Sequence, residues 1–225
     1  FSIVFLNYFG LDWIAIVRII PIATMILITK CYKYFYKIIM KRSFDLLFSL
    51  FALLLLIFPI IIIAFLVKIT SAGPIIHWSK RIGRNNHLFM MPKFRSMHVG
   101  APNKATHLLS NPGLYVTNFG RLIRLTSLDE LPQLISVIKG DMSLVGPRPA
   151  LISQNDLIEL RIKSGVDNLL PGITGWAQIN GRDKLSINEK VKLDKEYMVK
   201  QNIFFDIKIL WLTILSIRNQ DEVSH

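Results

Sequence analysis

The sequence predicts a mostly helical α/β protein in which a long membrane helix precedes a small globular domain. No charged residue occurs between Leu46 and Val67, and an apolar run of this length can cross a bilayer as a helix. Only two acidic residues, Asp12 and Asp45, precede Lys93, so the first third of the chain is apolar and basic. The rest alternates short apolar runs with Gly-rich and Pro-rich loops, which is typical of a small domain with its own core. We therefore divide the chain into an N-terminal segment without an assigned role, a membrane helix and a globular domain, at residues 1–40, 41–70 and 71–225.

The predicted membrane helix contains a proline near its middle. Pro59 lacks a backbone donor and its ring clashes with the preceding turn, so it kinks or breaks a helix. Basic residues flank the helix on both sides, with Arg42 before it and Lys68 after it. Because positive charge marks the cytoplasmic ends of membrane helices, both ends are expected on the cytoplasmic side. A re-entrant helix broken at Pro59 satisfies both observations, and a Pro-kinked helix that spans the bilayer is the alternative.

The globular domain is expected to contain short strands and several helices. Apolar patterning and turn residues place strands at 75–78 and 88–91, and helices at 127–138, 156–164, 186–200 and 203–217. Constrained loops are expected at 140–149 and 171–181. The last helix is strongly apolar between charged edges, which suits either a core helix or an amphipathic helix in the membrane interface, and we favour the interface.

The composition combines apolar residues with strong positive charge. Hydrophobic residues make up 52% of the chain, and the formal net charge is +12. Nucleic acid, anionic lipid headgroups and a phosphate-rich substrate can each explain such a charge. The sequence has no zinc-finger or RNP-type pattern, and no Walker A, GxGxxG or HExxH pattern. Five histidines without metal-ligand spacing and a single cysteine, Cys31, predict neither a zinc site nor an intrachain disulfide.

Two adjacent carboxylates, Asp129 and Glu130, stand at the predicted start of a helix and follow a basic stretch. One interpretation is structural: Ser127 caps the helix while Glu130 reaches back to the Ser127 amide, as in a capping box. The other is functional, because the positive end of a helix favours carboxylates and phosphates together. In that case Asp129 is a nucleophile or metal ligand, and Glu130 is a base or second ligand.

Four cationic side chains are candidates for binding phosphate. Lys93 and Arg95 share one face if they lie on a strand. Arg148 lies between two prolines, and an arginine held so rigidly loses little entropy when its fork binds phosphate oxygens. Arg182 ends a Gly-rich loop in which Trp176 is a candidate for stacking on a base or sugar. Each of these residues also has a structural explanation, so none identifies a site alone.

Taken together, these blocks resemble the bacterial sugar transferase family, the monotopic polyprenyl-phosphate phosphoglycosyl transferases. The matching motifs are KRSFD, GP, RIG, KFRSM, SLDELPQL, GDMSLVGPRP and PGITGWAQINGR, at residues 41–45, 73–74, 81–83, 93–97, 127–134, 140–149 and 171–182. They occur in the family's order, and several motifs in order are more specific than any one of them. The resemblance covers residues 41–217.

The resemblance implies a re-entrant membrane helix bent at Pro59 that carries a small cytosolic α/β catalytic domain with interfacial amphipathic helices. It also implies that Asp129 attacks the β-phosphate of a UDP-sugar, that UMP leaves, and that undecaprenyl phosphate then takes the sugar phosphate from the aspartate. Glu130 would assist proton transfer or metal binding, and Mg²⁺ would bind through Asp129. The implied phosphate-binding residues are Lys93, Arg95, Arg148 and Arg182, and the further site candidates are Arg81, Asp141, Trp176 and Gln178.

The implied enzyme performs the first membrane step of capsule, O-antigen, exopolysaccharide or glycoprotein glycan synthesis. It would lie at the bacterial inner (cytoplasmic) membrane with its catalytic domain facing the cytoplasm. Its expected partners are a UDP-sugar, undecaprenyl phosphate and the lipid bilayer, without nucleic acid. The sugar stays open among galactose, glucose, N-acetylgalactosamine and diacetylated amino sugars, and so does the oligomeric state, a homodimer included.

One position departs from the family pattern. The family usually has a serine before the proline of the bend, whereas this chain has Phe58. A serine hydroxyl can bond backbone groups freed at the bend, which phenylalanine cannot do. The bend at Pro59 is therefore expected to be supported differently.

Two other functions compete with the transferase. A membrane-anchored scaffold or lipid-binding protein would use its basic residues to hold anionic headgroups, but it gains nothing from Asp129 and Glu130 among cations. A soluble nucleic-acid-binding protein conflicts with the uncharged run at 46–67.

Overall fold

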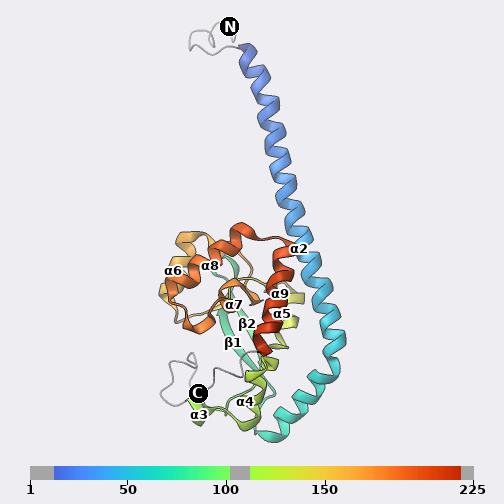
Figure 1. The fold of residues 1–225 in the computed structure, drawn as a ribbon, viewed down its shortest axis with the longest axis vertical. Coiled ribbons are helices and arrows are strands. Elements are labelled where there is room, and N and C mark those ends of the chain that lie inside the picture. The colour runs from blue at the N-terminus through green and yellow to red at the C-terminus, as the bar shows by residue number, and fades with distance from the viewer. Residues whose placement is uncertain (1–12, 102–111, 219–225) are drawn as a thin grey trace. The chain divides into compact units, whose positions relative to one another are not determined.

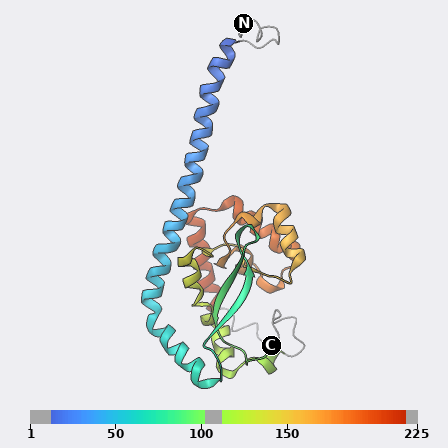
Figure 2. The same cartoon turned by 180° about the vertical axis from the view of Figure 1, so that it is seen from behind.

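The computed structural model describes residues 13–101 and 112–218. The chain divides into two compact units, Phe1–Arg42 and Ser43–His225, and the second contains the cores and cavities considered below. Figures 1 and 2 show the fold from two opposite sides. The elements follow in the order α2 (Trp13–Thr70), β1 (Ile76–Ile82), η1 (Arg84–Asn86), β2 (Leu88–Phe94), α3 (Pro112–Tyr115), α4 (Asn118–Leu125), η3 (Leu128–Glu130), α5 (Gln133–Lys139), β3 (Ser143–Val145), β4 (Ala150–Leu151), α6 (Asn155–Ser164), η4 (Val166–Asn168), β5 (Gly172–Thr174), α7 (Trp176–Ile179), η5 (Arg182–Lys184), α8 (Ile187–Lys200) and α9 (Ile203–Arg218).

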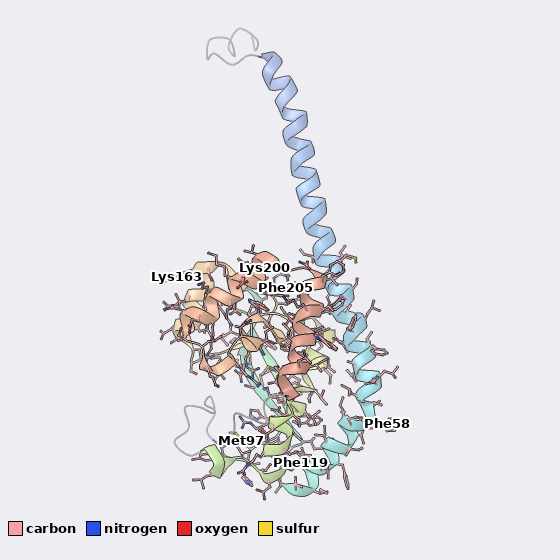
Figure 3. All side chains as sticks on the ribbon, in the orientation of Figure 1. Phe58, Met97, Phe119, Lys163, Lys200 and Phe205 are labelled. Atoms are coloured by element: carbon pink, nitrogen blue, oxygen red, sulfur yellow. The ribbon has the colours of Figure 1, made fainter. Side chains whose placement is uncertain are left out.

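Helix α2 is long and apolar enough, from Ile38 to Thr70, to cross a membrane. Leu54 and Phe58 are 73% and 75% exposed, as expected for side chains that face lipid. The predicted break at Pro59 is instead a bend, because α2 is helical without interruption through this residue. Figure 3 shows Phe58 on the outer side of the curved part of the helix. A proline bends a helix in this way by removing one hydrogen bond.

Both ends of the Ser43–Thr70 part of α2 are held by the same domain. Before the bend, the Asp45 carboxylate accepts a hydrogen bond of 3.2 Å from the Leu144 amide, and Phe44 joins the larger core. After the bend, Ile63 and Val67 pack in a second core with β2 and α4. The apolar side chains of α2 that point away from these cores remain exposed.

Two small sheets carry the loops of the domain. Strands β1 and β2 form an antiparallel hairpin, to which β4 adds at the other edge of β1, giving the order β2-β1-β4. Both hairpin strands extend beyond their predicted ends. The second sheet pairs β3 with β5 in parallel, Ser143 opposite Gly172. The sequence predicted only loops there, because each strand has three residues and too few alternations to show a period.

The helices expected near the C-terminus are confirmed in α6, α8 and α9. Ser186 caps α8 in a capping box with Glu189. The helix expected at 127–138 is wrong in its first half: a 3₁₀ turn covers Leu128–Glu130, and α5 begins only after Pro132. Ser127 has a left-handed backbone, φ 56°, and its side chain makes no capping hydrogen bond, so the capping-box interpretation of Glu130 is also wrong.

Candidate active site

The antiparallel register of β1 and β2 builds a basic cleft. His77 stands opposite Lys93 in the hairpin. Figure 2 shows the two strands of this hairpin. Because side chains alternate along a strand, Ser79 and Arg81 share the face of His77. The resulting cleft has a volume of about 310 Å³. Its other ionisable lining residues come from the segments that follow the hairpin and are Arg95, His98, Arg124 and Asp129. A cleft with this charge suits a ligand rich in phosphate.

Asp129 is the one carboxylate among the residues that line this cleft. The residue is only 8% exposed, and burial raises the pKa of its carboxyl; Lys93 opposes that shift, and the charge of Glu130 adds to it. In the described part of the chain, no hydrogen bond or ion pair of 4 Å or less engages the Asp129 carboxylate. Its oxygens are therefore available to attack an electrophile or to bind a cation.

Glu130 has the opposite environment, although it is the next residue. Its Oε1 accepts from Lys93 Nζ at 2.6 Å and from Arg148 Nη2 at 3.1 Å. Burial alone would raise the pKa of Glu130, but the charges of Arg148 and Lys93 outweigh it and hold that pKa well below its usual range. A carboxylate held so firmly ionised is a weak base. The geometry therefore favours Glu130 as the residue that places two cations, rather than as a proton carrier.

Arg148 is positioned through its backbone. Arg161 Nη1 donates to the Arg148 carbonyl at 2.8 Å, and the same guanidinium binds Asp194 Oδ2 at 2.7 Å. On the other side, the Gly172 amide donates to the Pro147 carbonyl at 2.9 Å. A Cβ on Gly172 would collide with the backbone of Gly146, so this close approach requires glycine. The rigidity predicted from the flanking prolines is thus reinforced by tertiary contacts.

The other cationic candidates are divided between the cleft and its surroundings. Arg95 lines the cleft beside Lys93, although β2 ends at Phe94, and its Nη2 donates to Ser71 O at 2.6 Å, which ties the end of α2 to the cleft. Arg81 lines the cleft, and burial followed by the charge of Arg148 lowers its pKa to about 10. Arg182 lies outside the cleft and lines a neighbouring cavity, but its charge helps to lower the pKa of Glu130.

Three further candidate residues lie outside the basic cleft. The Trp176 indole donates to Glu196 at 3.1 Å and packs on Phe205 at a ring-centroid distance of 5.0 Å, and it does not line the cleft. Asp141 is exposed in the turn after α5 and does not line the cleft. Gln178 donates to the Ile173 carbonyl at 3.0 Å and lines a neighbouring apolar cavity.

A magnesium ion suits this site only in company with a ligand. The described residues hold no group of three or more His, Cys, Asp or Glu side chains that could bind a metal alone. Mg²⁺ is commonly bound by one or two carboxylates together with substrate phosphates. The unpaired Asp129 carboxylate in a basic cleft fits that arrangement, with the phosphates of a bound substrate as the remaining ligands.

The residue-by-residue interpretation missed several members of the site. His77 and Ser79 could have been found from their alternation with Arg81, because these three lie at period 2 next to a predicted strand. Arg124 lines the cleft from the end of α4. Arg161 lies in the interior of α6, where no local pattern distinguishes it from a surface arginine.

Comparison with known proteins places this site in a family. The model of the bacterial sugar transferase family matches residues 36–220, and the chain belongs to that family. The UDP-glucose:undecaprenyl-phosphate glucose-1-phosphate transferase of Escherichia coli K12 is 40% identical over 183 residues, 78% of this chain and 39% of that protein. The undecaprenyl-phosphate galactose phosphotransferase of Salmonella typhimurium LT2 is 36% identical over 200 residues, 81% of this chain and 41% of that protein.

The relatives differ in length. The chain spans about two fifths of the E. coli and Salmonella proteins. In contrast, an uncharacterized sugar transferase of Bacillus subtilis 168 is 40% identical over 176 residues, 78% of this chain and 86% of that protein. The matched region contains the cleft, Asp129 and Glu130 in full.

Proposed function

We propose that this protein transfers a sugar 1-phosphate from a UDP-sugar to undecaprenyl phosphate and releases UMP. The observation that carries the proposal is the contrast between the two carboxylates: Glu130 is bound by two cations, whereas Asp129 is unpaired beside the same cations. The names of the E. coli and Salmonella relatives support the acceptor and the type of group transferred.

The reaction has two displacements at one phosphorus. First, an Asp129 oxygen forms a bond to the β-phosphorus of the UDP-sugar, the bond from that phosphorus to the bridging oxygen breaks, and UMP leaves with the electron pair. Second, a phosphate oxygen of the polyprenyl carrier attacks the same phosphorus, and the bond to Asp129 breaks. The products are a polyprenyl diphosphate sugar and the regenerated carboxylate. Both nucleophiles are oxyanions, so neither step needs Glu130 to remove a proton.

The cations in the cleft and beside it match the charge of this reaction. Lys93 and Arg148 are held by Glu130 next to Asp129, where negative charge accumulates on the transferred phosphoryl group. A magnesium ion held by Asp129 would neutralise further charge on the substrate. Arg81, Arg95 and Arg124 supply the positive field for the rest of the nucleotide-sugar.

We further propose that the bent part of α2 enters and leaves the same side of the bacterial cytoplasmic membrane, with the domain facing the cytoplasm. The 33-residue span Ile38–Thr70 is long enough to cross a bilayer. However, Asp45 near its start and Val67 near its end both pack in the same globular domain. One globular domain lies on one side of a membrane, so a helix whose two ends both pack against that domain fits a re-entrant topology better than a spanning one. Cysteines placed at Met40 and Ile69 should react with an impermeant reagent from the same side of the membrane, and labelling from opposite sides would refute this topology.

The function is tested by UMP release from detergent-solubilised protein with undecaprenyl phosphate and Mg²⁺. The donor panel should include UDP-glucose and UDP-galactose, since these sugars are named in relatives, as well as UDP-N-acetylgalactosamine and a UDP-diacetylated amino sugar. We expect carrier-dependent UMP from one donor, and none from Asp129→Asn. The matched control is Asp141→Asn, the same change at an exposed aspartate away from the cleft, which should keep full activity. Turnover by Asp129→Asn at the wild-type rate would overturn the proposal.

A further inference from the structure

The Asp129–Glu130 pair stands between two different cavities. Asp129 lines the basic cleft, whereas Glu130 lines a second cavity of about 430 Å³. We call this second cavity the apolar groove. Its apolar walls come from α2, the 128–134 segment, β5, α7 and α9, and include Ala52, Leu56, Leu131, Leu134, Leu210 and Ile214.

The apolar groove has few charged groups in its lining. Glu130 and Arg182 are the charged side chains among the described residues that line it. Two threonines in the wall, Thr174 and Thr213, bond each other through their hydroxyls at 2.7 Å and so present little free polarity. A ligand that fits this lining has an apolar body and an anionic end near Arg182, the one cation among the described residues that line the groove.

Two of the helices that form the walls of the groove, α2 and α9, also expose large apolar side chains on their surfaces. On α2, Leu55 is 63% exposed next to the groove residue Leu56, and on α9 Trp211 is 61% exposed next to Leu210. Helix α9 and the bent part of α2 run side by side (Figure 1). A lipid chain in the bilayer around α2 could therefore enter the groove without crossing water. A water-soluble ligand would have no reason to enter an apolar groove from the bilayer.

We infer that the apolar groove binds the first isoprene units of the polyprenyl phosphate acceptor, an inference that rests on the proposed function. Because displacement at phosphorus is in line, the attacking acceptor oxygen must occupy the position that UMP has left. The two substrates therefore share one phosphate position, next to Lys93 and Arg148. They differ in where the rest of each molecule lies: the nucleotide-sugar in the basic cleft and the isoprenoid in the apolar groove.

The first test fills the groove from α9. Ile214 lines the groove and is 58% exposed, so Ile214→Trp adds bulk at the opening without disturbing a buried core. Ile207→Trp is the matched control, since Ile207 is on the same helix, is 45% exposed and does not line the groove. We expect Ile214→Trp to raise the KM for undecaprenyl phosphate about tenfold. Losing the contact of even one methylene group in an apolar pocket weakens the binding of a substrate by about this factor. UMP release in the absence of acceptor should be unchanged in both variants.

The second test does not depend on turnover. A farnesyl phosphate with a diazirine on its first isoprene unit should cross-link to the groove segments of α2 or α9, and undecaprenyl phosphate should compete while phosphatidylglycerol should not. If this pattern is found but the wild type releases no UMP from any donor, the groove assignment stands and the proposed reaction fails. Equal KM values in the two tryptophan variants, labelling confined to the lipid-facing side of α2, or competition by phosphatidylglycerol would each overturn the groove assignment.

Discussion

Replacing Glu130 with glutamine should destabilise the protein, whereas replacing the neighbouring Asp129 with asparagine should not. Glu130 binds Lys93 in a pair whose side chains are only 16% and 10% exposed. Removing one partner of a buried ion pair costs about 3–5 kcal/mol, because the other charge remains buried and unpaired. Arg148 is 36% exposed, so it can turn to solvent and adds at most about 1 kcal/mol.

The two carboxylates also differ in the sign of their pH dependence. The pKa of Glu130 lies below its unfolded value, so its ionisation stabilises the fold above an ordinary glutamate pKa of about 4.3, and this contribution is lost as the pH falls toward the folded pKa. The pKa of Asp129 lies above its unfolded value, so ionising Asp129 costs stability as the pH rises through the folded pKa. At pH 7 Asp129→Asn should therefore be neutral or stabilising.

Urea unfolding in detergent, followed by tryptophan fluorescence, measures both effects. With a slope of about 2 kcal/mol per molar urea, a loss of 3–5 kcal/mol lowers the midpoint by about 1.5–2.5 M for Glu130→Gln. The midpoint of Asp129→Asn should stay at or above that of the wild type, and the Glu130→Gln difference should shrink below about pH 4. An equal loss in both variants, or a larger one in Asp129→Asn, would refute the different environments of the two carboxylates.

Three further outcomes follow from the same contacts. The rate of UMP release without acceptor should rise with pH through a pKa above the usual aspartate value and then level off, because Asp129 must be ionised to attack; a rate independent of pH from 4 to 8 would contradict this. Asp194→Asn should lower both the urea midpoint and the rate of transfer, because it leaves the Arg161 guanidinium buried without its carboxylate partner. An unchanged rate of transfer would show that Arg161 does not position Arg148. Gly172→Ala should lower the stability of the protein in thermal unfolding by about 1–3 kcal/mol, because the added Cβ would collide with the backbone of Gly146. Gly113→Ala is the control and should have little effect, since its Cβ would meet no atom within 4 Å. Similar losses of stability in both variants would contradict the close approach of Gly172 to Gly146.

Part of this candidate site was predictable from the sequence, because each motif lies within a few consecutive positions of the chain. Lys93, Arg148 and Glu130 were all predicted as site residues, and the structure joins them through two ion pairs. What the sequence could not show is the pairing itself, since Lys93 and Glu130 are 37 positions apart. The local pattern around Glu130 favoured a capping box, and the tertiary ion pairs replaced that local contact.

The errors in the fold have similar causes. The strands β3 and β5 have three residues each and are specified by pairing with one another, not by a period of their own. Pro59 was expected to break α2, because a proline in an isolated helix costs about 3 kcal/mol or more. Here the helix on both sides of Pro59 packs against the same domain, which offsets the lost hydrogen bond and limits the effect to a bend.

The domain connects the two ends of the bent helix to the residues that we propose bind phosphate. At one end Arg95 binds Ser71, while Lys93, two residues earlier on the same face, binds Glu130. At the other end Asp45 binds the Leu144 amide, in the segment that leads directly to Arg148. A shift of α2 in the bilayer would therefore move both cations that flank Asp129. In the proposed function the acceptor is confined to the membrane, so anchoring the helix through these two segments would fix the height of the Asp129 carboxylate relative to the bilayer, which a flexible tether between anchor and domain could not do.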